Sequence, residues 1–219
     1  RSKHHVGSKD IVFAFPLPEY KQDPHRACDR LQKGFDFLND LKLCESPTVA
    51  FGQRVVVGYR DPVEDRHCSP GWGTHWINVP WCWLTRPETD PIQVEIADQP
   101  EFLCSRELVH PFEHLFLKGN PNKRWKEGFC DSLRVFVLEA MGFSLYAQKW
   151  EEMIVAVAGK KKDEYHDAAG RILLWCRRHL GPRTGITSTQ LSSVIKRLIG
   201  LSMVEELDPR HEIQFSYKG

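Results

Sequence analysis

The sequence lacks a net charge of either sign and lacks any long apolar run. Lys and Arg number 30 against 29 for Asp and Glu, which leaves a formal charge of +1 over 219 residues. Nucleic-acid binders carry a clustered excess of basic charge, so this balance argues against a nucleic-acid partner. No apolar run approaches the roughly 20 residues that cross a bilayer, which argues against membrane insertion.

The chain also lacks the short signatures of several enzyme and metal-binding classes. It contains no G-x-x-x-x-G-K-[ST] phosphate-binding loop and no serine-nucleophile elbow. Its seven cysteines form no C-x-x-C pair, which argues against a zinc ribbon and a thioredoxin motif. The cysteines suit either disulfides in an exported protein or buried free thiols. Of these two we favour export, so the expected location is secreted.

The overall composition is typical of a globular protein, with 41% hydrophobic and 27% charged residues. A chain of 219 residues can bury a large core. Its hydrophobic pattern changes from strand-like to helical near residue 105. We therefore predict one α+β domain over residues 1–219, with a sheet-rich half over 1–104 and a helical half over 105–219.

The N-terminal half reads as strand, helix and strand. The apolar run from Ile11 to Phe15 ends at prolines and predicts a buried strand. Apolar residues at every third or fourth position from Cys28 to Cys44 predict a helix with one buried face. The valine-rich segment from Val49 to Tyr59 is broken by Gly52 and predicts one or two strands.

A tryptophan-rich segment follows, from Gly73 to Trp83. Its alternating apolar residues predict an extended chain. Pro80 cannot donate a hydrogen bond to a neighbouring strand, so we expect an edge strand here. Four tryptophans lie between Trp72 and Trp83, and we interpret them as packing residues in preference to the lining of a ligand groove.

The C-terminal half shows helical spacing throughout. A capping-box pattern of Thr187 and Gln190 marks the start of the clearest helix. Glycines at 142 and 159, and the Gly181-Pro182 pair, follow the ends of the others. The predicted helices cover residues 125–140, 153–157, 163–180 and 187–199.

One constellation could carry chemistry. Residues 106–110, with the sequence R-E-L-V-H, have the shape of H-E-x-x-H with Arg106 in place of the first histidine, and Glu127 follows 17 residues after His110. In such a site, histidines one helical turn apart and a carboxylate from a second helix bind one metal ion. A glutamate in the position of Glu107 then takes a proton from the metal-bound water.

This arrangement resembles the gluzincin metallopeptidases, including the plant basic secretory proteins, in which H-E-x-x-H is followed on the next helix by E-G-x-A-D. The resemblance covers Arg106 to Asp131. It implies a zincin-like fold, with a small mixed sheet whose edge strand lines the substrate cleft. In this chain the residues from that strand are His75, Trp76 and Asn78.

The resemblance also assigns roles to single residues. It implies that His110 is the second zinc ligand, Glu127 the third ligand and Glu107 the general base, and that Asp131 supports a ligand from behind. Arg106 departs from the family pattern, because a guanidinium has no lone pair to give to zinc. The standard set of three ligands is therefore incomplete.

Two other interpretations stay open at this stage. His114 lies one turn after His110, so both could bind zinc with Glu127, and Glu113 would be the base of an inverted H-x-x-E-H motif. The close E-G-x-x-D element argues against that inverted class, whose third ligand is distant. Alternatively, Pro111 begins the helix and the likeness of the preceding residues to H-E-x-x-H is accidental.

Three functions follow. The first is a catalytically impaired metallopeptidase-like protein that binds a peptide, a glycan or a protein in its cleft, with Arg106 in the metal position and paired to Glu127 or Glu107. The second is an active hydrolase with zinc as its cofactor, held by His110, His114 and Glu127. The third is an interaction module, unrelated to peptidases, that docks a partner through its aromatic strand and its last helix.

Overall fold

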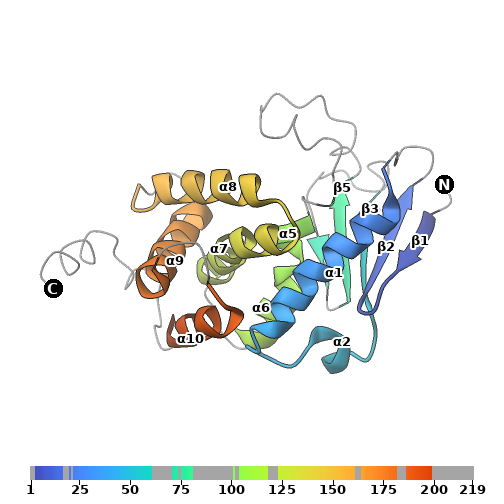
Figure 1. Ribbon diagram of the computed structural model, residues 1–219, viewed down its shortest axis with the longest axis horizontal. Helices are drawn as coiled ribbons and strands as arrows, with labels where there is room; N and C mark the ends of the chain where they lie inside the picture. The colour runs from blue at the N-terminus through green and yellow to red at the C-terminus, as the bar shows by residue number, and fades with distance from the viewer. Residues whose placement is uncertain are drawn as a thin grey trace, which may run out of the picture.

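The chain folds as an α+β protein with a small mixed sheet followed by a mostly helical C-terminal half. The computed structural model describes residues 3–16, 20, 22–60, 71–73, 75–80, 101, 104–117, 123–160, 164–181 and 186–198. In Figure 1 the sheet lies at one end of the molecule and the last helices lie at the other. The predicted α+β class is therefore confirmed.

Five strands form the sheet in the order β1-β2-β3-β5-β4. They are β1 (Lys3–Gly7), β2 (Ile11–Pro16), β3 (Val55–Arg60), β4 (Gly71–Trp72) and β5 (Trp76–Pro80). The three central strands β2, β3 and β5 are parallel, and the outer strands β1 and β4 run antiparallel to their neighbours. Central strands are covered on both faces, and in β2 the predicted run buries Ile11, Phe13, Ala14 and Phe15.

The prediction that the segment from Gly73 to Trp83 forms an edge strand is wrong. Its described part, β5, lies between β3 and the short strand β4, which pairs with Ile77 and Asn78. Pro80 is the last residue of β5, beyond the two positions that β4 reaches. Because proline removes only its own hydrogen bond, the strand accepts a neighbour further back.

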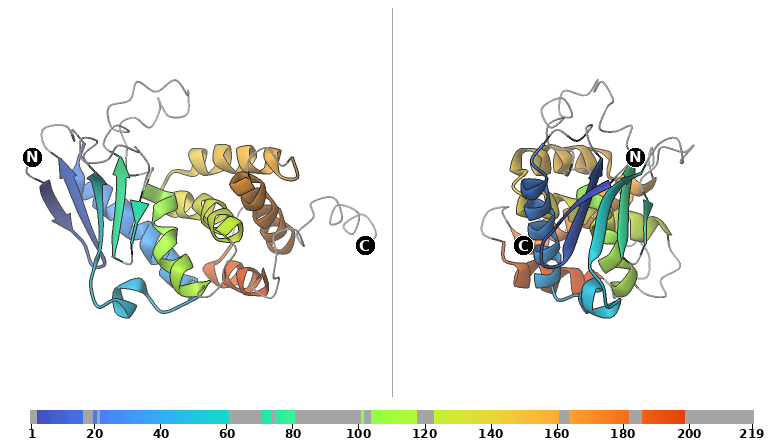
Figure 2. Two further views of the ribbon diagram at one scale, coloured as in Figure 1. Left: turned by 180° about the vertical axis from the view of Figure 1, so that it is seen from behind. Right: turned by 90° about the vertical axis from the view of Figure 1, so that its right-hand side faces the viewer.

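Helix α1 (Pro24–Asp40) covers one face of the sheet. It lies in front of the strands in Figure 1 and behind them in the reverse view of Figure 2. The helix begins where the side chain of Asp23 accepts a hydrogen bond from the amide of His25, with Pro24 in the first turn. The residues predicted to form its buried stripe, Leu31, Phe35 and Leu38, are all buried.

The segment predicted as strand from Val49 begins differently. Residues Pro47–Ala50 form a short helix, α2, and Gly52 then adopts a φ of 69°. The strand β3 starts only at Val55. A proline in the first turn favours a helix start, and this local preference overrides the strand propensity of Val49.

The C-terminal half is built from α5 (Cys104–Glu107), α6 (Val109–Phe116), α7 (Lys123–Ala140), α8 (Ser144–Val157), α9 (Glu164–Leu180) and α10 (Ser188–Leu198). The capping box is confirmed, since the Gln190 amide donates to the Thr187 hydroxyl and the Thr187 amide donates back to the Gln190 side chain. Helix α8 starts at Ser144, well before the predicted Met153. Ile199 lies outside the described residues.

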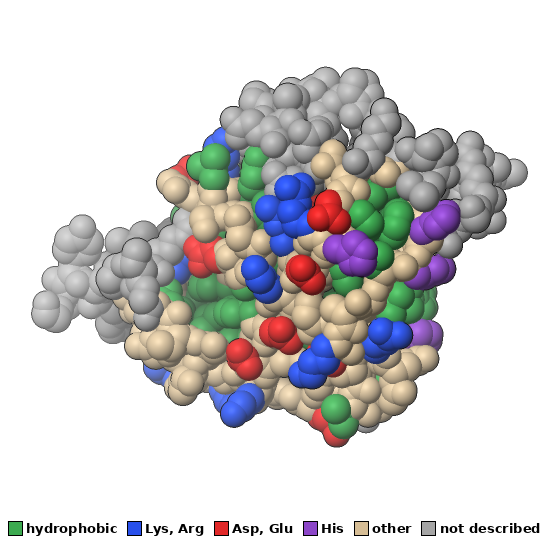
Figure 3. Space-filling view, turned by 45° about the vertical axis from the view of Figure 1, so that its right-hand side comes forward, with side chains coloured by type: hydrophobic (Ala, Val, Ile, Leu, Met, Phe, Trp, Pro, Cys, Tyr) green, Lys and Arg blue, Asp and Glu red, His purple; other side chains and the backbone are tan. Residues whose placement is uncertain are grey.

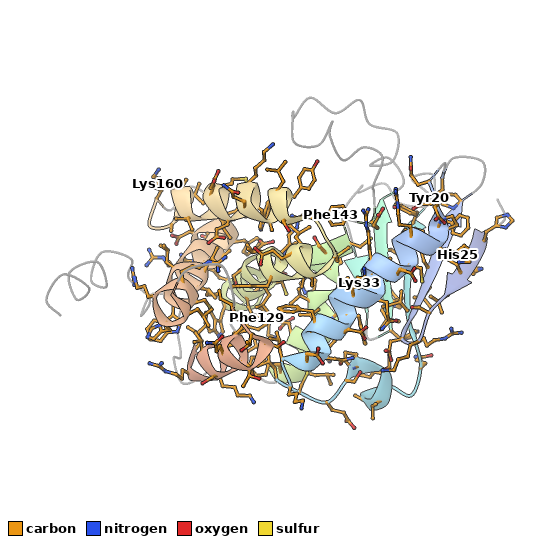
Figure 4. All side chains as sticks on the ribbon, in the orientation of Figure 1. Tyr20, His25, Lys33, Phe129, Phe143 and Lys160 are labelled. Carbon is orange, nitrogen blue, oxygen red and sulfur yellow. The ribbon has the colours of Figure 1, made fainter. Side chains whose placement is uncertain are left out.

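The interior of this half is closely packed around α7. Figure 4 labels Phe129 of α7 among the helices and Phe143 beside α1. The ring centroid of Phe129 lies 5.7 Å from that of Phe116. The Arg30 guanidinium of α1 lies 4.7 Å from the centroid of Phe143, which links the first helix to the last half of the chain.

We expect Gly128→Ala to lower the free energy of unfolding by about 1–3 kcal/mol through overpacking. A Cβ at Gly128 would meet the Cβ of Ala168 on α9 at 2.5 Å and backbone atoms at 3.0 Å, so α7 and α9 would have to separate. The matched control is Gly34→Ala, which should cost less, because its Cβ would meet side-chain atoms and no backbone, Met141 at 3.1 Å and Val137 at 3.2 Å. Urea unfolding followed by circular dichroism measures both. Equal stabilities for the two variants would contradict the role of Gly128.

The described helices and the charged side chains on the surface can be compared with what the composition predicts. None of the described helices is both long and apolar enough to span a bilayer. On the face shown in Figure 3, acidic and basic side chains of the described residues are interspersed. The five cysteines in the described part, all free thiols, are Cys28, Cys44, Cys104, Cys130 and Cys176.

Candidate functional site

The residues that resemble H-E-x-x-H lie on a nearly continuous helical stretch. Leu108, between α5 and α6, has helical dihedral angles, and its amide donates to the carbonyl of Cys104. Pro111 is the third residue of α6 and has no amide to give to the Glu107 carbonyl, which explains the break between the two helices. The interpretation that the helix begins at Pro111 is therefore wrong, and Arg106 and His110 lie one turn apart.

Helix α7 runs beside α5 and α6 and supplies the acids that meet Arg106 (Figures 1 and 2). The Nε of Arg106 donates to Oδ1 of Asp131 at 2.6 Å, and its Nη2 donates to Oε2 of Glu127. The Nη1 donates to Oε1 of Glu107 at 3.0 Å and lies 3.1 Å from Nε2 of His110. One guanidinium thus contacts three carboxylates and an imidazole.

Burial makes this group of charges interdependent. Side-chain exposure is 3% for Glu107 and 4% for Asp131, but 21% for Arg106 and 20% for Glu127. The site therefore reaches solvent through the Arg106–Glu127 pair. Burial alone would lower the pKa of Arg106, but Asp131, Glu107 and Glu127 raise that pKa well above its usual value. The guanidinium is a fixed cation.

The second nitrogen of His110 faces a different set of side chains. Its Nδ1 lies 3.3 Å from Sγ of Cys130 and 3.7 Å from Oε2 of Glu113. All three residues are buried, and their ligand atoms lie within 4.8 Å of one another, so the group could hold a metal ion. Burial raises the pKa of the Cys130 thiol well above its usual value, and the charge of Glu113 adds to this effect.

Trp150, which the sequence did not indicate, holds the backbone of Asp131, and Arg134 packs against Trp150. The indole N–H of Trp150 on α8 donates to the backbone carbonyl of Asp131 at 3.0 Å. The Arg134 guanidinium lies 4.2 Å from the centroid of that indole ring, and its Nε donates to Ser105. Burial lowers the pKa of Arg134 to about 10, although Asp131 opposes the shift, so this cation also stays charged. A lone tryptophan on a half-buried helix carries no sequence signal for this role.

The other residues predicted from the sequence are His114 and the three that would line a cleft, and their burial and position differ from those of the residues around Arg106. His114 is exposed, whereas His110 is buried, and the group able to hold a metal within the described residues does not include His114 or Glu127. Trp76 and Asn78 are half-buried on β5, where Trp76 lies over Gly73. His75 immediately precedes that strand. The predicted cleft from these three residues stays a prediction, but the edge position assumed for them is wrong.

Comparison of the chain with protein-family models, with curated proteins and with solved structures gives no match. The resemblance to gluzincins therefore rests on the sequence pattern from Arg106 to Asp131 alone.

Proposed function

We propose that this chain is a catalytically impaired metallopeptidase-like protein with a zincin-like ancestry, which binds peptides without cleaving them. The observation that carries the proposal is the position of the Arg106 guanidinium. It contacts Glu107, His110, Glu127 and Asp131, which match the base, two ligands and supporting acid of the gluzincin pattern. A cation on a side chain has replaced a bound cation.

This replacement removes the chemistry that hydrolysis needs. A metal ion lowers the pKa of a bound water towards 7 and polarises the substrate carbonyl, and it needs an open coordination position to do so. The guanidinium has no coordination position for water. Glu107, in the position of the base, already accepts a hydrogen bond from Arg106. What remains is a charged, partly open site suited to binding.

The outer pair of the site supports a polar ligand. Arg106 and Glu127 are each about one-fifth exposed, so a donor and an acceptor group face the solvent together. A peptide backbone offers both kinds of partner, and peptides are the substrates of the family that the chain resembles. Glycans and protein surfaces offer the same groups, and they are the other ligands to test.

One observation weighs against each alternative function. The rearranged zinc hydrolase needs His114 beside His110 and Glu127, but His114 is exposed. A large separation between His110 and Glu127 would favour the interaction module unrelated to peptidases. Instead, Nε2 of His110 lies 3.9 Å from Oε2 of Glu127.

The test is a peptide library presented to the purified protein, with retention and cleavage measured together by mass spectrometry. We expect retention of a subset of peptides and no cleavage, with or without added zinc. Glu127→Gln should reduce retention about tenfold, since it weakens a charged hydrogen-bonding group at the opening. The exposed Glu152→Gln on α8 is the matched control and should retain peptides normally. Cleavage that a chelator abolishes would contradict the proposal.

A further inference from the structure

We propose that His110, Glu113 and Cys130 form a second site, which shares His110 with the first and binds zinc through Nδ1 of the imidazole. This site lies on the opposite edge of His110 from Arg106. It does not depend on the peptide-binding function, because none of its three side chains belongs to the exposed Arg106–Glu127 pair.

Two of the three distances between the ligand atoms fit a tetrahedral metal, and the third, from Sγ of Cys130 to the Glu113 carboxylate, is within 4.8 Å. Zinc bonds of roughly 2.0–2.3 Å place neighbouring ligand atoms about 3.3–3.7 Å apart in a tetrahedron. Here Nδ1 of His110 lies 3.3 Å from Sγ of Cys130 and 3.7 Å from Oε2 of Glu113. Small side-chain movements would therefore suffice to admit the ion.

The helices place the three donors rigidly. His110 and Glu113 are three residues apart on α6, so both project towards α7, which carries Cys130. A thiolate, an imidazole and a carboxylate are the donors that zinc uses, whereas calcium and magnesium prefer oxygen alone. The residue types thus select a thiolate-binding metal.

Glu113 provides an independent reason to expect a ligand. It is 2% exposed, and its Oε1 has no hydrogen-bond partner. The ammonium of Lys126 is the nearby cation, at 3.8 Å from that oxygen. A buried carboxylate oxygen without a hydrogen bond is unfavourable, and a metal ion held by both oxygens of Glu113, or by Oε1 after the carboxylate turns, would satisfy it.

The surrounding charges can accommodate the ion. Three cations (Arg106, Lys126 and Arg134) accompany four carboxylates (Glu107, Glu113, Glu127 and Asp131), which leaves one negative charge. Zinc adds two positive charges, and the Cys130 thiol loses one proton when its S–H bond is replaced by a sulfur–zinc bond. The proton passes to solvent, and the cluster becomes neutral.

The other nitrogen of His110 also has suitable partners. A metal on Nδ1 leaves the ring proton on Nε2. Nη1 of Arg106, itself a donor, lies 3.1 Å from Nε2 and has to turn away, and the ring N–H then faces Oε2 of Glu107 at 3.7 Å and Oε2 of Glu127 at 3.9 Å. Metal-binding histidines usually donate their second N–H to a carboxylate or carbonyl in this way.

Cobalt tests the site directly, because a cobalt–thiolate bond absorbs in the near ultraviolet. We expect chelator-treated, reduced protein to bind one equivalent of Co²⁺ with this absorption and to exchange it for Zn²⁺. Cys130→Ser should abolish the absorption and weaken zinc binding by more than about 100-fold, since even residues that only orient a ligand change affinity 10–100-fold. Cys176→Ser, at another buried free thiol, is the matched control and should bind normally.

Glu113→Gln gives a second, nearly isosteric variant and should weaken zinc binding at least tenfold. Absence of the thiolate absorption in folded wild-type protein, or unchanged binding in Cys130→Ser, would overturn the proposal. The peptide-retention assay separates the two proposals: without added metal, Cys130→Ser should retain peptides as wild type does, whereas Glu127→Gln should keep the cobalt–thiolate absorption.

Discussion

Arg106→Leu is expected to lower the free energy of unfolding by about 3–5 kcal/mol, the usual loss when one partner of a buried ion pair is removed. The guanidinium donates to Glu107, Glu127 and Asp131, two of which are almost fully buried. Leucine would leave these carboxylates close together without a cation. Urea unfolding at neutral pH, followed by circular dichroism, measures the effect.

Two further substitutions test whether the missing ion pairs cause that loss of stability. Arg54→Leu removes an exposed guanidinium that donates to the Ser8 carbonyl at 3.3 Å, and it should change stability by less than about 0.5 kcal/mol. Arg106→Lys keeps the charge but loses the planar set of donors, so its stability should lie between those of wild type and Arg106→Leu. A loss below about 1 kcal/mol in Arg106→Leu would show that the charges are not coupled as described.

Arg106→His is expected to raise zinc affinity on the order of 1000-fold at the Nε2 edge of His110, because a complete ligand set replaces an incomplete one. The new histidine would lie one turn from His110, and Glu127 would face both from α7. The measurement is competition with a chromogenic chelator. Using Cys130→Ser as the parent protein removes any contribution from the thiol side of the imidazole.

Its controls separate ligand restoration from the simple loss of a cation. Arg106→Gln removes the same charge but supplies no imidazole, so it should show little of the gain. Glu127→Gln, added to Arg106→His, should reverse most of it. Equal zinc affinity in the histidine and glutamine variants would refute the idea that residue 106 occupies a former ligand position.

The sequence predicted those helices that depend only on residues close together in the chain. Helix α7 follows from its apolar spacing, and α10 follows from the capping box of Thr187 and Gln190. The pairing of Arg106 with Glu107 and Glu127 was also predictable, because helical spacing and the match to a known pattern place the charges together.

Other features depend on contacts between distant segments and were missed for that reason. Strand β4 has only two residues, too few for a period-two pattern, so the sequence predicts β5 as an edge strand. Cys130 occupies an unspecified position of the E-G-x-x-D element, so the pattern assigns it no role. Its role depends on which nitrogen of His110 it faces, and no spacing rule contains that information.

The position of His110 between two groups of side chains has an energetic consequence. Arg106 can only donate, so its contact with Nε2 keeps the imidazole in the tautomer that is protonated on Nδ1. A metal on Nδ1 requires the opposite tautomer. Thermodynamic linkage makes this competition reciprocal. An anionic ligand that draws the guanidinium away from the ring would tighten metal binding on the far side, and the metal would tighten that ligand by the same factor.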